Sequence, residues 1–175
     1  MNKIYALLLL LSSTFLMQAC NEKSSKEKIN MQTLEQAPDF TLLDQDNKSH
    51  KLSDYSSQYV LVYFYPKDDT PGCTKEACML RDNYEGFKER NIQVFGISSD
   101  DPASHKKFIE KYHLPFTLLS DTEKSVAKLY DAEGIFLKRI SYLIAPGGKI
   151  LKFYPNVDPA NHASEILADF DSAKN

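Results

Sequence analysis

Two cysteines five residues apart carry the clearest chemical signal in the sequence. Cys73 and Cys78 follow the loop 66–72, which itself follows an uninterrupted apolar and aromatic run at 59–65. The run predicts a buried strand and the residues after the loop predict a helix, so Cys73 would lie in the first helical turn. Unpaired backbone N–H groups and the helix dipole favour an anion at that place. A thiol there is expected to be partly thiolate at neutral pH and to act as a nucleophile.

The spacing of the two cysteines limits how they can pair. In an intact helix their Cα atoms would be about 8–9 Å apart, and a disulfide needs less than about 7 Å. They could join only if the first turn unwinds, which suits a redox switch better than a permanent crosslink. Three alternatives stay open: a static disulfide with no helix here, a Cys73 that only fills a gap on the apolar stripe, and, with a poorly matching spacing, zinc.

Strands and helices alternate along the rest of the chain. We expect a small hairpin at 40–52 and strands at 59–65, 92–98, 117–119, 140–144 and 150–154. Helices are expected at 74–90 and 121–130, with another that starts at Asp101-Pro102 and carries Phe108, Ile109 and Tyr112, and a last one that starts at Asp158-Pro159. This order predicts an α/β fold with a mixed central sheet flanked by helices. Strands joined through helices should run parallel, whereas the turn Pro146-Gly147-Gly148 should join an antiparallel pair.

The composition excludes several classes of protein. The chain has 175 residues, of which 42% are hydrophobic, and a formal net charge of −3. This composition excludes a disordered tail, a fibre and a polytopic membrane protein. Because the chain has no surplus of basic residues to neutralise phosphates, nucleic acid is not expected as a partner. The four histidines, His50, His105, His113 and His162, are expected to be surface or packing residues, and the charged run 104–111 a solvated helix face.

The first residues of the chain are expected to be a targeting segment. Residues 1–19 combine one positive charge, a short apolar run and a small residue before Cys20, which is typical of a secretion signal. The segment before Cys20 resembles a bacterial lipobox, which predicts lipidation of Cys20, attachment to a membrane and a location in the bacterial cell envelope, outside the cytoplasmic membrane. Residues 20–36 would be a flexible tether and 37–175 the folded domain. The alternative is an uncleaved signal anchor with an incidental thiol.

The cysteine loop resembles that of the peroxiredoxins. Pro66, Thr70 and Cys73 match the family signature, and the second cysteine five positions on is similar to the peroxiredoxin Q group, also called bacterioferritin comigratory proteins. The resemblance runs from Ala37 to the last helix and implies a thioredoxin-like fold. By resemblance, Cys73 is the peroxidatic cysteine and Cys78 the resolving one.

The same resemblance assigns three further site residues. Thr70 would hydrogen-bond the peroxide, Pro66 would shield the pocket, and the family's catalytic arginine maps best to Arg139. The implied function is a thiol-dependent peroxidase that reduces hydrogen peroxide or organic hydroperoxides through a sulfenic acid and an intramolecular disulfide. A thioredoxin-like dithiol would recycle it, no metal, flavin or haem would be needed, and the protein would be a monomer.

Two other functions compete with this one. A copper chaperone similar to the membrane-tethered Sco proteins would use soft thiolates, but those proteins have three residues between their cysteines and this chain has four between Cys73 and Cys78. A lipoprotein with an inert disulfide would form that bond only slowly with peroxide. A thiol–disulfide oxidoreductase would need two residues between its cysteines, a spacing absent here.

Overall fold

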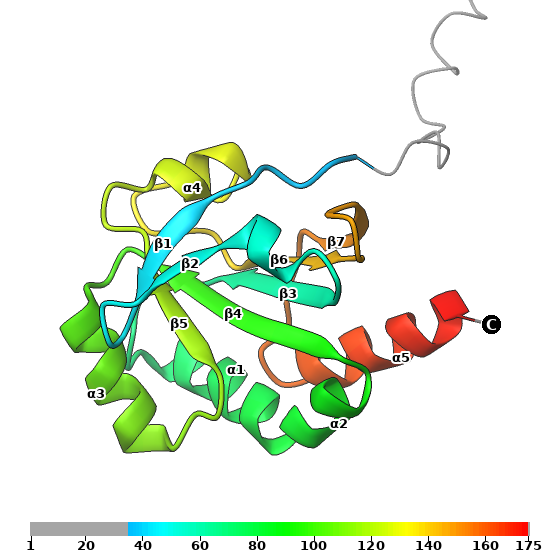
Figure 1. Ribbon diagram of the computed structural model, residues 1–175. Helices are drawn as coiled ribbons and strands as arrows, with labels where there is room; N and C mark the ends of the chain where they lie inside the picture. Colours follow the sequence, from blue (N-terminus) through cyan, green and yellow to red (C-terminus); the bar gives the residue numbers. More distant parts are fainter. Residues whose placement is uncertain (1–34, 175) are drawn as a thin grey trace, which may run out of the picture. The chain divides into compact units, whose positions relative to one another are not determined.

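The computed structural model describes residues 35–174. The predicted signal peptide, Cys20 and most of the predicted tether lie outside this part of the chain. Within it, seven strands form a mixed sheet with helices on both faces (Figure 1). The predicted α/β class with a mixed central sheet is confirmed.

The elements follow one another in the predicted alternation. In chain order they are β1 (Thr41–Asp44), β2 (Ser49–Lys51), the 3-10 helix η1 (Leu52–Tyr55), β3 (Tyr59–Phe64), α1 (Pro71–Asp82), α2 (Tyr84–Glu89), β4 (Ile92–Ser98), α3 (Pro102–Tyr112), β5 (Thr117–Ser120), α4 (Ser125–Leu129), β6 (Ile140–Ile144), β7 (Ile150–Tyr154) and α5 (His162–Lys174). In the sheet the strands lie in the order β2-β1-β5-β4-β3-β6-β7. β3 and β4 are parallel, as are β4 and β5, whereas β6 runs antiparallel to both β3 and β7.

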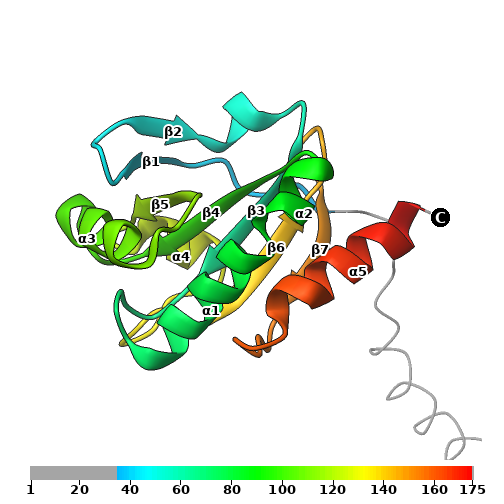
Figure 2. The same ribbon diagram turned by 90° about the horizontal axis from the view of Figure 1, so that it is seen from below.

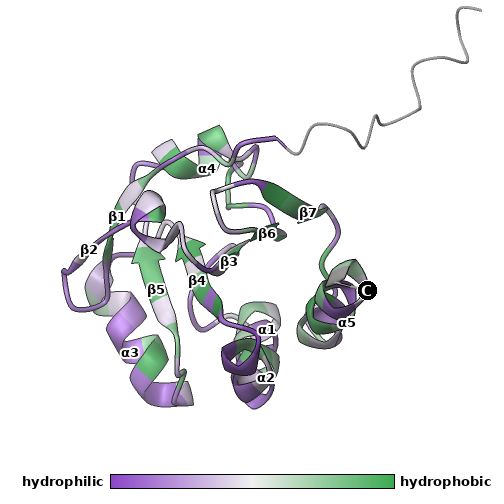
Figure 3. Ribbon diagram, turned by 45° about the vertical axis from the view of Figure 1, so that its right-hand side comes forward, coloured by the Kyte–Doolittle hydropathy of each residue, from purple (hydrophilic) through white to green (hydrophobic). Residues whose placement is uncertain are grey.

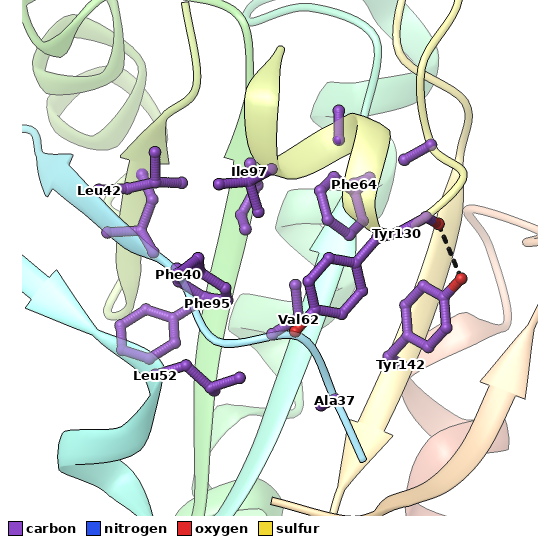
Figure 4. Packing of buried hydrophobic residues seen from close by; sticks show 14 of the residues in the cluster. Ala37, Phe40, Leu42, Leu52, Val62, Phe64, Phe95, Ile97, Tyr130 and Tyr142 are labelled. Atoms are coloured by element: carbon purple, nitrogen blue, oxygen red, sulfur yellow. Dashed lines mark hydrogen bonds between the residues drawn. The ribbon is translucent and has the colours of Figure 1, made fainter. Parts of the chain in front are cut away.

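Strand β3 is buried on both faces, as its continuous apolar sequence predicts. Val60, Val62 and Phe64 point into one hydrophobic cluster, which α4 covers (Figure 4). Leu61 and Tyr63 point into the other, which α1, α2 and α5 cover (Figure 2). The carboxyl end of β3 is thereby held firmly at the place where the cysteine loop begins.

The predicted helix 74–90 is in fact two helices. α1 begins three residues earlier, at Pro71, and ends at Asp82, and α2 begins at Tyr84. Asn83 interrupts them with a backbone conformation outside the helical region, φ −105° and ψ 10°, while its backbone N–H and its side-chain amide both donate to the carbonyl of Met79, at 3.2 Å and 2.9 Å. Of the predicted apolar stripe, Cys73, Ala77, Leu80 and Phe87 are buried, and Tyr84, just after the break, is half-buried against the same cluster.

Helix α3 begins as its sequence predicts. The carboxylate of Asp101 accepts a hydrogen bond from the backbone N–H of Ser104 at 2.8 Å, and Pro102 occupies the first helical position. Hydrophilic and hydrophobic bands alternate along α3 in Figure 3, whereas β5 beside it is mostly hydrophobic. The predicted solvated face is interrupted, because His105 within the run 104–111 is fully buried.

Three predicted boundaries need correction. The helix predicted at 121–130 is the shorter α4, which begins at Ser125, although the Asp121 carboxylate does accept hydrogen bonds from the backbone N–H groups of Val126 and Ala127. The last helix begins at His162 rather than at Pro159, because the Asp158 carboxylate accepts from the Ala160 N–H and closes a turn first. At the other end, two residues of the predicted tether already belong to the fold. Gln36 pairs with Lys149, and the Glu35 carbonyl accepts a hydrogen bond from the Ile150 N–H.

Within residues 35–174, no helix is both long and apolar enough to cross a bilayer.

Candidate active site

Cys73 lies in the first turn of α1, where the sequence places it. The residue before the helix, Thr70, is extended, and Pro71 opens the helix. Cys73 is 2% exposed and packs on the stripe with Ala77 and Leu80. The backbone N–H groups of this turn have no partner inside the helix, so they favour negative charge on a sulfur or oxygen nearby.

Arg139 reaches the sulfur from a distant part of the chain. Its Nη2 donates to Cys73 Sγ at 3.2 Å. Sheet pairing explains this approach: β6 runs antiparallel to β3 with Ile140 opposite Phe64. The residue before β6 therefore lies beside the loop that follows β3. A guanidinium at this distance stabilises a thiolate and any negative charge that leaves it.

Glu76 binds the other side of the same guanidinium. Its Oε2 forms an ion pair with Arg139 Nη1, and the Glu76 side chain is fully buried. Burial raises the pKa of Glu76 to about 7, although the charge of Arg139 acts in the opposite direction. Burial likewise disfavours the charge of Arg139, but Glu76 and then Cys73 outweigh it and raise the pKa of Arg139.

Sequence reasoning missed Glu76, although a signal was present. It stands three residues after Cys73 and directly before Ala77, which puts it next to the stripe predicted to face the core. A carboxylate on a buried helical stripe is rarely found without a partner. That position therefore indicates a cation nearby, which the structure identifies as Arg139.

Pro66 and Thr70 belong to the loop that leads from β3 to α1, and Thr70 directly precedes the helix. Both are half-buried. The Thr70 hydroxyl donates to the carbonyl of Lys67 at 3.1 Å, a bond within the loop. Gly72 lies against Arg139, because a Cβ added there would meet Nη2 at 3.2 Å. A glycine thus stands where the arginine approaches the first turn of α1.

Cys78 lies on the same helix as Cys73. Both thiols are free, Cys73 buried and Cys78 half-buried, and α1 continues unbroken past both of them to Asp82. This agrees with the prediction that an intact helix keeps them apart. Arg81 lies beside Cys78, and Asp82, with a smaller contribution from that sulfur, raises the pKa of Arg81.

The histidines behave as predicted, as packing or surface residues. His50 pairs with Asp44, and His105 with Asp68. His162 is buried and bonds the Ser141 hydroxyl through Nε2 at 2.8 Å. Burial, followed by the positive charge of Arg139, lowers the pKa of His162 to about 4. His113 is exposed and ends α3.

No group of three or more His, Cys, Asp or Glu side chains in the described range 35–174 is arranged to hold a metal ion.

Comparison with known proteins gives one family throughout. The family model described as AhpC/TSA matches residues 33–153. Chloroplastic peroxiredoxin Q of Gentiana triflora is 45% identical over 141 residues, which cover 78% of this chain and 65% of that protein. The japonica rice protein of the same name is 48% identical over 136 residues, or 75% of this chain and 63% of that protein. The chain thus spans less than two thirds of the length of these plant relatives.

Solved structures give the same result. Peroxidoxin BcpB of Mycobacterium tuberculosis superposes with a TM-score of 0.76 at 32% identity, covering 82% of this chain and 98% of that one. A peroxiredoxin Q mutant of Xylella fastidiosa gives a TM-score of 0.75 at 27% identity and covers 82% and 99% of the two chains. The resemblance to the peroxiredoxin Q group and the thioredoxin-like fold are both confirmed, and nothing here favours a copper chaperone.

The predicted location is wrong by the same comparison. We expected a lipid-anchored protein of the bacterial cell envelope, but the names of the plant relatives place those proteins in chloroplasts. Cys20, on which the predicted lipidation depends, lies outside the described residues.

Proposed function

Because the chain belongs to the AhpC/TSA family, we propose that it is a thiol-dependent peroxidase that reduces hydrogen peroxide or organic hydroperoxides. The observation that carries the proposal is the hydrogen bond from Arg139 to the sulfur of a buried cysteine in a first helical turn. A cation, a helix N-terminus and a thiol at one point favour thiolate. The thiolate is the form that attacks a peroxide bond.

In the first step, the Cys73 thiolate attacks the terminal oxygen of the hydroperoxide. The O–O bond breaks, an S–O bond forms, and the electron pair of the broken bond leaves on the second oxygen. That oxygen takes up a proton and departs as water or an alcohol, while Cys73 becomes a sulfenic acid. Arg139 stabilises the thiolate and the charge that develops on the leaving oxygen.

Thr70 and Pro66 shape the space in which this happens. Thr70 would turn its hydroxyl from the Lys67 carbonyl toward the peroxide, and the backbone N–H groups of the first turn would orient both oxygens. The half-buried ring of Pro66 would limit access of water to the sulfenic acid. Glu76 would act through Arg139, since its ion pair with the guanidinium restricts where that group can point.

In the second step, the thiol of Cys78 condenses with the sulfenic acid. An S–S bond forms and water leaves. Two residues five apart in an α-helix are about 7.5 Å apart along its axis, which is too far for a disulfide. The start of α1 must therefore unwind first, and the weak local signals there support this step: Thr70 makes no side-chain cap, and Gly72 stands in the first turn.

An external dithiol of the thioredoxin type would complete the cycle. It would attack the disulfide by thiol exchange, leave with its own disulfide, and return Cys73 and Cys78 to thiols. No metal, flavin or haem takes part in the proposed cycle. We propose that the protein works as a monomer, which sedimentation velocity on the full chain would test.

Single-turnover chemistry on the full chain tests the assignment. The chain has no tryptophan, so quenched flow followed by mass spectrometry is the suitable readout. Cys78→Ser should react once with hydrogen peroxide and leave a sulfenic acid that dimedone traps on Cys73. Cys73→Ser should show no fast reaction. Consumption of peroxide by Cys73→Ser at the native rate would disprove the proposal.

A further inference from the structure

The loop between β3 and α1 carries a buried carboxylate for which the proposed reaction has no use. Asp68 is 7% exposed and stands midway between the two pocket residues Pro66 and Thr70. Burying a carboxylate is unfavourable unless its oxygens are hydrogen-bonded. A buried acid in a short connecting loop therefore implies a set of partners that fix it in place.

The structure provides those partners from the residue that follows β3 and from α3. Oδ1 of Asp68 accepts from the Tyr65 hydroxyl at 2.7 Å. Oδ2 accepts from the Ser104 hydroxyl at 2.7 Å and is bonded to His105 Nδ1 at 2.9 Å. Ser104 and His105 belong to α3, so the loop is tied to a helix that follows it in the chain by more than thirty residues.

The hydrogen bonds of His105 fix its role. Its side chain is completely buried, and Nε2 has no hydrogen-bond partner among residues 35–174. A proton on Nε2 would be a buried donor without an acceptor, which is costly. We therefore assign the proton to Nδ1, which donates to the Asp68 carboxylate. The histidine then has no second donor, and the shorter of the two contacts of Nδ1 is directed at the loop: Asp68 Oδ2 lies at 2.9 Å and the Tyr65 hydroxyl at 3.4 Å.

We propose that Asp68 and His105 are a positioning pair for peroxide attack: by binding the loop to α3 they hold Pro66 and Thr70 where Cys73 meets its substrate. The inference rests on the proposed function. In the proposed reaction, neither Asp68 nor His105 touches the reacting atoms. Their effect would be on geometry, and a displacement of about 1 Å in a positioned group can slow a reaction about 100-fold.

A second attachment of the same loop provides the contrast. Asp69 binds Lys111 Nζ at 2.6 Å and the Tyr112 hydroxyl at 2.6 Å, also on α3. The side chains of Lys111 and Asp69 are about half exposed, at 56% and 48%. Exposed ion pairs contribute little to stability. The buried attachment through Asp68 should therefore fix the position of the loop, and the exposed ion pair of Asp69 should contribute much less to it.

The pair should influence one chemical step and not the other. Peroxide attack needs the loop, because Pro66 and Thr70 line the proposed pocket. Disulfide formation needs α1 to unwind after Thr70, a change that leaves Asp68 bound to α3. Loss of the pair should therefore slow sulfenic acid formation while the condensation with Cys78 keeps its rate.

The test uses full-length His105→Leu, His105→Asn and, as the matched control on the same helix, Lys111→Ala. Quenched flow measures the rate of Cys73 oxidation by hydrogen peroxide and, separately, the rate of disulfide formation. His105→Leu should oxidise at least tenfold more slowly and form the disulfide within twofold of the parent rate. His105→Asn, whose amide can replace the Nδ1 donor, should recover to within threefold, and Lys111→Ala should stay within twofold.

Oxidation of folded His105→Leu within twofold of the parent rate would overturn the inference, as would an equal slowing of both steps. If His105→Leu does not fold, Ser104→Ala removes another donor from the same carboxylate at a half-buried position. It should slow oxidation about threefold, and an unchanged rate would count against the pair. A parent protein without fast Cys73 oxidation would instead refute the proposed function.

Discussion

Helices α1 and α3 start alike and are stabilised in opposite ways. Each follows an extended residue and has proline at its first position. In α3 the Asp101 side chain caps the first turn through Ser104, and His113 closes the other end in the left-handed conformation. In α1 the Thr70 hydroxyl donates to Lys67 instead, so the first turn has no side-chain cap. α3 is stabilised by its own residues, and the start of α1 is not.

The second residue of each helix strengthens the contrast. α1 has Gly72 where α3 has Ala103, and glycine in a helix costs about 1 kcal/mol relative to alanine. What holds the first turn of α1 in place is tertiary: the burial of Cys73 and the contacts of Arg139 with Cys73 and Glu76. A turn held mainly by the reactive sulfur and its partner can open once that sulfur is oxidised, whereas α3 stays formed and supports the loop.

The largest expected effect comes from removing the tertiary support of α1. Arg139→Gln deletes the donor to Cys73 and should slow Cys73 oxidation by about 10²–10³-fold, equivalent to about 3–4 kcal/mol of transition-state stabilisation. Quenched flow measures the rate. The matched control is Arg90→Ala, which removes a guanidinium paired with Asp171 on the helix α5. The role of Arg139 is refuted if the two variants oxidise equally fast.

The buried charge on α1 should appear in the pH dependence of stability. Because the pKa of Glu76 is raised to about 7 from 4.5, its contribution is fully present below pH 4.5 and is lost as pH rises to about 7. Because the pKa of His162 is lowered to about 4 from 6.5, its contribution has the opposite sign: stability increases as pH rises from about 4 to 6.5. Each effect is about 3 kcal/mol, so in the intact chain they largely offset each other.

Single substitutions should separate the pH dependence that Glu76 contributes to stability from the one that His162 contributes. In Glu76→Gln, the free energy of unfolding should increase with pH between 4 and 6.5 more steeply than in the parent chain. In His162→Gln, it should decrease between pH 4.5 and 7. Urea unfolding across this range measures both, and parallel curves for the parent and both variants would show that neither group is coupled to folding in this way.

Removing the cap of α3 should cost stability without affecting the cysteines' second step. Asp101→Ala leaves the Ser104 N–H without its acceptor and should lower the free energy of unfolding by about 1 kcal/mol. The rate of disulfide formation should be unchanged, because α3 does not unwind in the cycle. Denaturant unfolding measures the free energy of unfolding, and quenched flow measures the rate of disulfide formation. A rate of disulfide formation different from that of the parent chain would contradict the contrast between the two helices.

The smallest effect should come from strengthening α1. Lys75→Ala exchanges an exposed lysine for a better helix former and removes a positive charge near the helix N-terminus. The two changes together should stabilise the helix by about 0.5 kcal/mol. Disulfide formation should then be about twofold slower, because unwinding becomes harder. Lys107→Ala, an exposed lysine on α3, is the matched control and should leave that rate unchanged. An equal response of both variants would mean that unwinding of α1 does not limit the step.

Much of this arrangement follows from local sequence. Periodicity predicts β3 and the buried stripe of α1, and the loop between them places Cys73 in a first turn. The break at Asn83 was missed because it depends on the backbone conformation of one residue, which the apolar periodicity does not report. The late start of α5 was missed for a similar reason, since Asp158-Pro159 fits a helix start and forms a turn instead.

The partners of the site could not be read from local sequence. Arg139 meets Cys73 only because β6 pairs with β3 in the register that sets Ile140 opposite Phe64, and sheet register depends on the whole core. Asp68 finds His105 across a separation of 37 residues. A resemblance to known proteins indicated Arg139, and the place of Glu76 directly before Ala77 was a signal that went unused, but the burial of Asp68 became visible only with the fold.

Hydrogen exchange on the oxidised protein tests most directly that Cys73 works by opening its own helix. One equivalent of hydrogen peroxide is added to the reduced full chain, the Cys73–Cys78 bond is mapped by mass spectrometry, and amide protection is compared before and after. We predict that the disulfide forms and that the first turns of α1 lose protection while α3 keeps it. Peroxide consumed with α1 still protected and the two cysteines unlinked would contradict this mechanism.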